Sequence, residues 1–255
     1  CSVFFLDIKD FTKLSEELNS RVLVEIMSEA FEILSRIIDD HGGIIDKYIG
    51  DCIMAFWQYS DHELKACRCA LQCKQALEEL TISLKSRDLP ALECRIGINS
   101  GGVLMGNFGS THRFNFTLIG DNVNLASRVE SLNKQYDSTI MITENTRCEL
   151  PENVFLTRRL ERVQVKGKEK STLVHELLGV TSKATGEQLN AVLIFEKAMT
   201  EYFVGNFNVA KELFLSIPDY EQDQVIVKKV VQCDEYRELM GENNGWNGIL
   251  RMDLK

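Results

Sequence analysis

The chain has 255 residues, of which 44% are hydrophobic and 26% are charged, as expected for one large globular domain or one domain with an appendage. Its net charge is −9 and no segment is rich in lysine or arginine, which excludes nucleic acid as the main partner but leaves room for a local basic pocket. No apolar stretch approaches the roughly 18–20 residues that a membrane-spanning helix needs.

The first part of the chain alternates strand-like and helix-like segments. Residues 2–7 form a continuous apolar run, and apolar residues then recur every three or four positions from 12 to 40 until His41-Gly42-Gly43. The expected elements are strand 2–7, one long helix 12–40, strands 43–49 and 52–57 around a Gly50-Asp51 turn, helix 61–86 and strand 92–99. This order, strand–helix–strand–strand–helix–strand, predicts an α+β fold of the ferredoxin-like type.

Further elements extend this core. We expect strands at 102–105, 113–119 and 139–142, a helix at 121–136, and a closing hairpin of 163–166 with 173–178 around Gly167. From residue 181 the chain turns polar and then helical, with a helix pair at 189–203 and 208–216 that resembles a tetratricopeptide-type hairpin. We therefore divide the chain into a domain at 1–180 and a helical tail at 181–255, which is either an interaction module or, as we favour, a pad packed on the domain or a regulatory element beside a dimer interface.

The cysteines indicate the compartment. The eight cysteines do not follow the regular spacing of a disulfide framework, which predicts reduced thiols of a cytoplasmic domain. Cys67, Cys69 and Cys73 are close enough to be considered as metal ligands, but no second Cys or His pair completes a tetrahedral site. We expect them to pack as small apolar residues. Because residue 1 already lies in a strand-like run, we also expect a sensor or membrane-anchoring region upstream in the full-length protein.

Two aspartates, Asp7 and Asp51, stand where apolar strand-like runs stop. An aspartate at a strand end is more often a cap or turn residue than a catalytic one. If the two side chains converge, however, they make a site for Mg²⁺ or Mn²⁺, and free amides at the start of the following helix could bind phosphate oxygens.

A later segment adds an amide and a guanidinium. Asn124 and Arg128 are four residues apart on a predicted helix and so share one face. Together they suit a ribose oxygen and a phosphate charge, although the spacing alone is also typical of a helix surface.

At this point the set of motifs resembles the catalytic domain of class III nucleotidyl cyclases, which convert a nucleoside triphosphate to its 3′,5′-cyclic monophosphate and pyrophosphate. The matching segments, in the order of the family, are 5–12, 42–55, 95–106, 116–128 and 165–167.

The resemblance implies a role for each matching residue. Asp7 and Asp51 would hold two Mg²⁺ or Mn²⁺ ions, with help from the Ile8 carbonyl. Asn124 would orient the ribose and Arg128 would stabilise charge at the α-phosphate. The residues implied to contact the other phosphates are Phe11, Thr12, Arg95 and Lys166.

The base would be read by Lys47 and Thr117. A lysine donates to adenine N1 and a threonine hydroxyl can pair with the 6-amino group, whereas guanine would favour a carboxylate at position 47. Lys with Thr resembles adenylyl cyclases, and within them the subgroup in which bicarbonate stimulation is often seen. ATP is the expected substrate.

Lys47 and Asp51 are four residues apart across a turn, so both can hardly serve one pocket. In the family each site lies between two subunits, which implies a homodimer with two equivalent sites. The alternatives are a guanylyl cyclase, opposed by Lys47, a catalytically silent nucleotide-binding dimerisation module, opposed by the intact motif residues, and a diguanylate cyclase, whose characteristic turn is absent.

Overall fold

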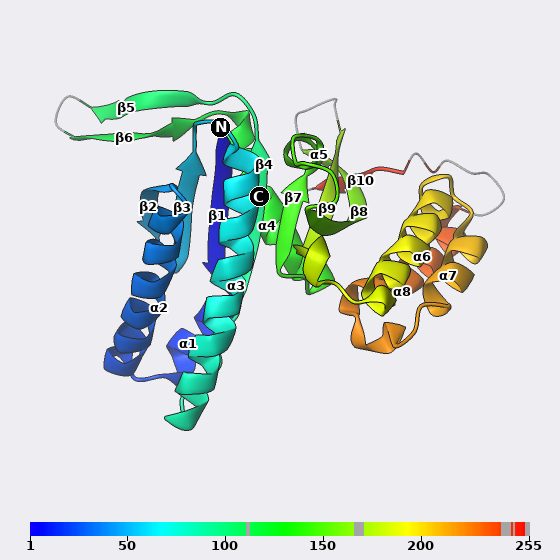
Figure 1. Cartoon of the computed structure of the whole chain (residues 1–255), viewed down its shortest axis with the longest axis horizontal. Coiled ribbons are helices and arrows are strands. Elements are labelled where there is room, and N and C mark those ends of the chain that lie inside the picture. Colours follow the sequence, from blue (N-terminus) through cyan, green and yellow to red (C-terminus); the bar gives the residue numbers. More distant parts are fainter. Residues whose placement is uncertain (111–112, 166–170, 241–245, 247, 253–255) are drawn as a thin grey trace.

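The computed structural model describes residues 1–110, 113–165, 171–240, 246 and 248–252. Across these residues one sheet has the strand order β10-β8-β9-β7-β4-β1-β3-β2, and β5 pairs with β6 in a separate ribbon (Figure 1). The strands are β1 (Ser2–Ile8), β2 (Ile44–Ile49), β3 (Cys52–Trp57), β4 (Cys94–Ser100), β5 (Leu104–Ser110), β6 (Arg113–Ile119), β7 (Ile140–Thr143), β8 (Phe155–Val165), β9 (Ser171–Val180) and β10 (Leu250–Met252). The α-helices are α1 (Phe11–Glu17), α2 (Ser20–Asp40), α3 (His62–Ser86), α4 (Asp121–Tyr136), α5 (Glu144–Cys148), α6 (Gly186–Phe203), α7 (Phe207–Leu215) and α8 (Gln224–Met240).

The half of the sheet ordered β4-β1-β3-β2 is antiparallel throughout. With α1 and α2 between β1 and β2, and α3 between β3 and β4, it has the ferredoxin-like connectivity. The predicted α+β fold class is therefore confirmed.

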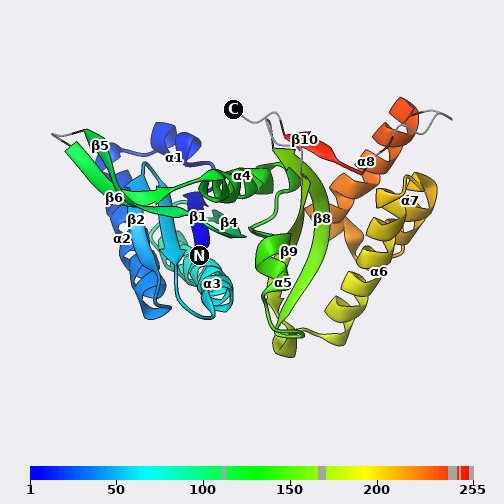
Figure 2. The same ribbon diagram turned by 90° about the horizontal axis from the view of Figure 1, so that it is seen from above.

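Strand β1 divides its side chains between two cores. Phe4, Leu6 and Ile8 pack with α2 and α3 on one face of the sheet, while Val3 and Phe5 pack with residues of α4 on the other. Figure 2 shows α3 and α4 on opposite sides of β1. Because alternate residues of a strand share a face, Asp7 falls on the α4 side, at the end of the strand. The alternation that builds the core thus also aims the first candidate site residue.

One element differs from the sequence-based expectation. The predicted single helix over 12–40 is two helices, α1 and α2, separated at Leu18 and Asn19. Leu18 is extended, and the Asn19 side chain accepts a hydrogen bond from the Arg21 amide as the N-cap of α2. The apolar spacing continues across this break, so periodicity alone did not reveal it.

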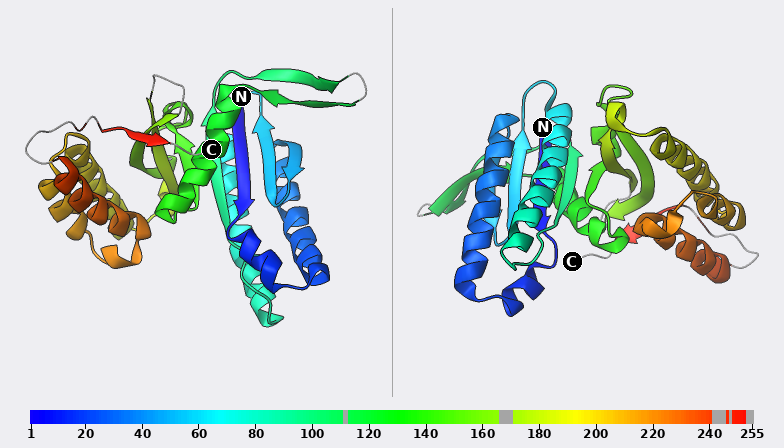
Figure 3. Two further views of the ribbon diagram at one scale, coloured as in Figure 1. Left: turned by 180° about the vertical axis from the view of Figure 1, so that it is seen from behind. Right: turned by 60° about the horizontal axis from the view of Figure 1, so that its bottom comes forward.

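The tail is joined to the sheet by a continuous core. Side chains of α6, α7 and α8 pack with β8, β9 and the far side of α4, and Figure 3 shows these helices beside β8, away from α2 and α3. Strand β10 then pairs in parallel with β8. Trp246 packs against Tyr202, Phe207 and Tyr236, and its indole nitrogen donates to the Tyr202 carbonyl. The division at 180/181 and the tetratricopeptide-like character of the tail stay predictions.

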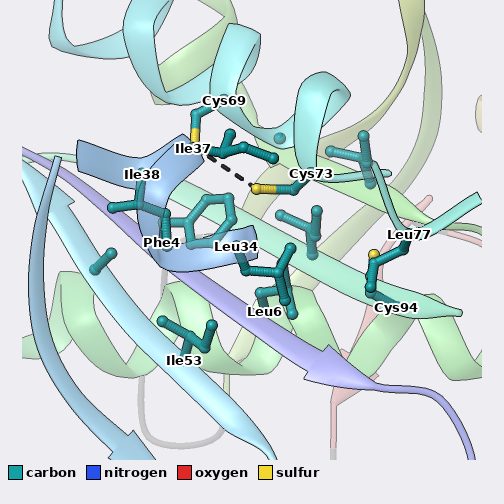
Figure 4. Packing of buried hydrophobic residues seen from close by; sticks show 14 of the residues in the cluster. Phe4, Leu6, Leu34, Ile37, Ile38, Ile53, Cys69, Cys73, Leu77 and Cys94 are labelled. Carbon is teal, nitrogen blue, oxygen red and sulfur yellow. Dashed lines mark hydrogen bonds between the residues drawn. The ribbon is translucent and has the colours of Figure 1, made fainter. Parts of the chain in front are cut away.

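Cys67, Cys69 and Cys73 lie in α3 and are fully buried in the core between that helix and the sheet. The sulfurs of Cys69 and Cys73 are 3.8 Å apart, and Figure 4 shows the contact between them among the apolar side chains of the core. Burial raises the pKa of the Cys67 thiol. Within the described residues no group of three or more His, Cys, Asp or Glu side chains could hold a metal ion. The three cysteines are core residues, as expected. Nor does any described helix combine the length and hydrophobicity required to cross a bilayer.

Candidate active site

The two strand-end aspartates meet. Asp7 is the last residue of β1 whose side chain lies on the side of the sheet facing α4. Asp51 follows Gly50, whose positive φ of 65° makes the tight turn between β2 and β3. The two aspartate carboxyl groups lie close enough for the charge of Asp51 to act on the Asp7 carboxyl. Burial raises the pKa of Asp7 to about 6, and the negative charge of Asp51 adds to the rise. Two carboxyl groups held together in this way favour a bound cation.

A cavity of about 560 Å³ adjoins this pair. It includes all of the residues predicted to hold metals or terminal phosphates within the described part of the chain, namely Asp7, Ile8, Phe11, Thr12, Asp51 and Arg95. Lys166, the remaining predicted phosphate contact, lies outside the described residues.

Arg95 supplies positive charge to the cavity. It is the cross-strand partner of Asp7 between β1 and β4, so both side chains leave the same face of the sheet. Its side chain is 9% exposed, and its contact with Asp10 is a long one of 3.4 Å. Its Nε has no hydrogen-bond partner among the described residues. A buried guanidinium N–H without a partner is costly, and an anionic ligand would satisfy it.

Helix α4 contributes three residues that the sequence did not single out, Glu130, Ser131 and Lys134. The helix can pack this close to the sheet because Gly97 of β4 has no side chain. A Cβ at that position would lie 2.2 Å from the main-chain nitrogen of Glu130. Burial raises the pKa of Glu130 to about 7, and the Asp7 charge contributes. The four-residue spacing of Glu130 and Lys134 was the available signal, but it describes many solvent-exposed helix faces equally well.

A second polar group lies on β2 and β6. The Lys47 Nζ donates to the Thr117 hydroxyl at 2.9 Å, so the two residues predicted to read the base are in contact. A third residue, Asp46, joins them: its carboxylate lies 2.8 Å from the Thr117 hydroxyl and 3.1 Å from the Lys47 Nζ. The sequence-based reasoning did not identify Asp46. None of the three residues lines the cavity beside Asp7.

Asn124 and Arg128 lie four residues apart on α4, as expected. Asn124 is exposed and Arg128 is partly exposed. Neither side chain makes a hydrogen bond or ion pair with another described residue, and neither lines the cavity beside Asp7. Both are therefore available to a ligand that approaches from outside the Asp7 cavity.

The donor set beside Asp7 fits a magnesium-type ion. It offers two carboxylates and the nearby main chain of Ile8, all of them oxygen donors. Mg²⁺ usually takes one or two protein carboxylates and completes its shell with water and substrate phosphates. A pair of aspartates beside an arginine whose Nε lacks a partner suits a cation that arrives together with a polyphosphate.

Comparison with known proteins identifies relatives of this arrangement. A family model described as the adenylate and guanylate cyclase catalytic domain matches residues 1–178. An adenylate cyclase of Anabaena cylindrica is 36% identical over 184 residues, which cover 69% of this chain and 36% of the relative. Adenylate cyclase 1 of Rhizobium meliloti is 32% identical over 183 residues, covering 70% of this chain and 27% of the relative. The chain thus spans about a third or less of these curated relatives.

Solved structures give the same picture. The adenylyl cyclase CyaB from P. aeruginosa is 31% identical with a TM-score of 0.65, and the match covers 72% of this chain and 96% of that one. The guanylyl cyclase Cya2 is 30% identical with a TM-score of 0.63, covering 72% of this chain and 94% of its own. Enzymes named for either nucleotide are therefore similar to this chain.

Proposed function

The chain belongs to the adenylate and guanylate cyclase catalytic domain family, the class III nucleotidyl cyclases, and we propose that it is an adenylyl cyclase that converts ATP to 3′,5′-cyclic AMP and pyrophosphate. The observation that carries the choice of ATP is the contact between Lys47 and Thr117 at 2.9 Å. A lysine ammonium can only donate, which matches the acceptor N1 of adenine and opposes the N1–H of guanine.

In the reaction, the ribose O3′ forms a bond to the α-phosphorus while the bond from that phosphorus to the pyrophosphate oxygen breaks. Divalent cations held by Asp7 and Asp51 would supply Lewis-acid activation of the 3′-hydroxyl, whose proton leaves to solvent, and neutralise the departing pyrophosphate. Arg95 binds the terminal phosphates through its unpaired N–H. Asn124 orients the ribose, and Arg128 stabilises charge at the α-phosphate.

We propose that each site is shared between two copies of the chain. The Asp7 cavity and the Lys47–Thr117 group have no lining residue in common, which supports a division of labour between subunits. Large apolar side chains are also exposed around the base-reading group, on β2 and on the β5–β6 ribbon: Tyr48, Ile49, Leu104, Phe114 and Phe116. An exposed apolar surface of this kind is typical of a protein interface.

The guanylyl alternative predicts cyclic GMP from GTP, and the silent-module alternative predicts no cyclic product. Purified protein is incubated with ATP or GTP and Mn²⁺, and the products are identified by chromatography and mass spectrometry. We expect cyclic AMP from ATP and a much slower reaction with GTP. A preference for GTP would overturn the adenylyl assignment. If neither cyclic AMP nor cyclic GMP forms at concentrations where the dimer forms, the enzyme assignment is overturned.

The shared site is tested by mixing inactive variants. A heterodimer of Asp51→Ala with Arg128→Ala contains one site with an intact metal half and an intact Arg128, so we expect partial recovery of activity. The matched control mixes Asp7→Ala with Asp51→Ala, where both lesions lie in the metal half and no site can be restored. Inactivity of the first mixture despite demonstrated heterodimers would contradict the shared site.

Bicarbonate is a further proposed effector, because the Lys–Thr pair resembles the subgroup in which stimulation is often seen. Activity is compared in sodium bicarbonate and in sodium chloride at the same pH and ionic strength. Equal rates would remove this proposal and leave the cyclase assignment untouched.

A further inference from the structure

We propose that Asp46 is a specificity-determining positioning residue that makes the Thr117 hydroxyl a hydrogen-bond acceptor, so that the base pocket selects purines with an amino group at position 6. The proposal rests on the proposed function and deepens it. It explains how a threonine, which can donate or accept, distinguishes one purine from another.

A bulge in β2 brings Asp46 to this place. Strand pairing with β3 shifts between Ile45 and Lys47, so that Asp46 is an extra residue without a partner in the register. In a regular strand, neighbouring side chains point to opposite faces. Here Asp46 and Lys47, adjacent in sequence, both reach the Thr117 hydroxyl of β6. Bulges recur beside active sites, where they re-aim a side chain.

The three groups fix the direction of each hydrogen bond. A lysine ammonium only donates and an ionised carboxylate only accepts. The Thr117 hydroxyl lies 2.8 Å from the Asp46 Oδ2 and 2.9 Å from the Lys47 Nζ. Its proton must therefore go to Asp46, one lone pair of the oxygen accepts from Lys47, and the second lone pair is left for a ligand. In this arrangement Thr117 accepts.

Burial keeps the arrangement from being replaced by water. The Asp46 side chain is 1% exposed, and Thr117 is also buried, whereas the Lys47 side chain is 38% exposed. The lysine has three N–H groups, so it can keep its contacts with Asp46 and Thr117 and still donate to a base. The buried pair is thus rigid, and the lysine is the part that reaches outward.

The pattern of donor and acceptor matches adenine at both positions of its Watson–Crick edge. Lys47 donates to N1, and Thr117 accepts from the 6-amino group. Guanine and hypoxanthine carry a hydrogen on N1 and an oxygen at position 6, so each would place donor against donor and acceptor against acceptor. A buried site made for one pattern rejects the opposite one strongly, because its polar groups are left unpaired.

Removing the negative charge of Asp46 should change the role of the Thr117 hydroxyl. In Asp46→Asn, the side-chain amide can donate to the Thr117 oxygen, which frees the threonine proton to point into the pocket. The hydroxyl can then donate to a 6-oxygen. We expect the ratio of kcat/KM for ATP to that for inosine 5′-triphosphate to fall by at least about tenfold relative to the unsubstituted protein.

Purine riboside 5′-triphosphate separates this effect from a change in Lys47. This analogue keeps the N1 acceptor but has no substituent at position 6, so nothing on it meets Thr117. We expect its kcat/KM to change less than about threefold in Asp46→Asn. If ATP and this analogue lose activity equally, the effect runs through Lys47 or through general damage, and the proposal is overturned.

Two more variants complete the test. Thr117→Val removes the acceptor and should bring ATP to the level of purine riboside triphosphate, and adding Asp46→Asn to it should change the ATP-to-inosine-triphosphate ratio no further. Asp46→Ser serves as the second substitution if circular dichroism shows that Asp46→Asn is unfolded, and Asp40→Asn controls for loss of a surface carboxylate. An active protein whose ratio is unchanged by the folded Asp46 variant overturns this proposal alone, whereas a protein without any cyclic product overturns it together with the proposed function.

Discussion

Two charged groups flank α4, one half-buried and one fully buried, and they differ in how their charges are balanced. On one side Asp7 and Asp51 adjoin an open cavity, where Arg95 keeps an unpaired N–H. On the other side Glu161 of β8 and Lys229 of α8 form an ion pair at 2.7 Å, with both side chains fully buried.

The second group is closed by its surroundings. The Tyr136 hydroxyl of α4 donates to Glu161 at 2.6 Å, and the Lys229 ammonium lies 4.4 Å from the centre of the Tyr202 ring. One positive and one negative charge cancel there, and the aromatic rings exclude water. The first group has adjacent negative charges and room for a ligand. The comparison teaches that burial alone does not mark a site; an uncompensated charge beside a cavity does.

The largest effect is expected where the closed pair is broken. Glu161→Ala leaves the Lys229 ammonium buried without a partner, and we expect the free energy of unfolding to fall by about 3–5 kcal/mol. Urea denaturation measures this. The double variant Glu161→Gln, Lys229→Met carries no charge and keeps an acceptor for Tyr136, so most of the lost stability should return. A loss below about 1 kcal/mol in Glu161→Ala would show that the pair is not structural.

Substitution in the Asp7–Asp51 pair should lower activity and leave stability unharmed, opposite to the effect expected for Glu161→Ala. Asp51→Asn removes a proposed metal ligand, and we expect kcat to fall by more than about 100-fold. The same substitution relieves repulsion between the two carboxylates, so the free energy of unfolding without metal should stay constant or rise. Steady-state kinetics and urea denaturation on one preparation give both numbers. A loss of stability as large as that of Glu161→Ala would erase the contrast between the two groups.

The sequence predicted the Asp7–Asp51 group but not the Glu161–Lys229 ion pair. Asp7 and Asp51 were recognisable because each ends an apolar strand, and β1 and β3 pair side by side in a ferredoxin-like core. Lys229 was not recognisable as a buried residue, because it follows another lysine in a helix of mixed polar and apolar sequence and its partner is 68 positions away. Burial of a lysine depends on tertiary packing, which a local pattern does not contain.

Asp46 shows a second limit. On the sequence it reads as an ordinary member of an alternating strand, with its side chain opposite to that of Lys47. The bulge that reverses this depends on the register with β3. The break at Asn19 is similar, because the cap that starts α2 interrupts a continuous apolar period. Periodicity predicted the elements and their faces; local irregularities needed the structure.

Metal binding gives a smaller and separable effect. Mn²⁺ at 10 to 100 times its dissociation constant should stabilise the protein by about 1–3 kcal/mol, because it binds the folded carboxylate pair and not the unfolded chain. Thermal denaturation with and without Mn²⁺, and with the metal removed by EDTA, measures the shift. The Asp51→Asn protein should lose the shift, and the Glu161→Gln, Lys229→Met protein should keep it. A shift that survives in Asp51→Asn would assign the metal to another site.

A third polar pair falls between the two extremes and gives the smallest effect. His175 of β9 is buried and contacts the Glu144 carboxylate, which is partly exposed. Burial lowers the pKa of His175 below 6.5, even though hydrogen bonding to Glu144 and the charges of Glu144 and Glu196 act in the opposite direction; the charge of Arg147 lowers it further. Because the unfolded chain then binds the proton more tightly, this contribution to stability is present above pH 6.5 and is lost as the pH falls below it.

We therefore expect the contribution of His175 to the free energy of unfolding to decline between pH 7 and pH 5. The carboxyl groups of Asp7 and Glu130, whose pKa values are raised, act in the opposite direction over this range, so the test is the difference between two proteins. Lowering the pH should destabilise the unsubstituted protein relative to His175→Gln by up to about 1 kcal/mol. Urea denaturation at a series of pH values measures both slopes, and His41→Gln, on a partly exposed histidine at the end of α2, is the matched control. Equal slopes in the unsubstituted protein and in His175→Gln would mean that Glu144 fully compensates for burial. The pair would then belong with Glu161 and Lys229 as a balanced structural contact, and charge balance rather than burial would separate these two pairs from Asp7 and Asp51.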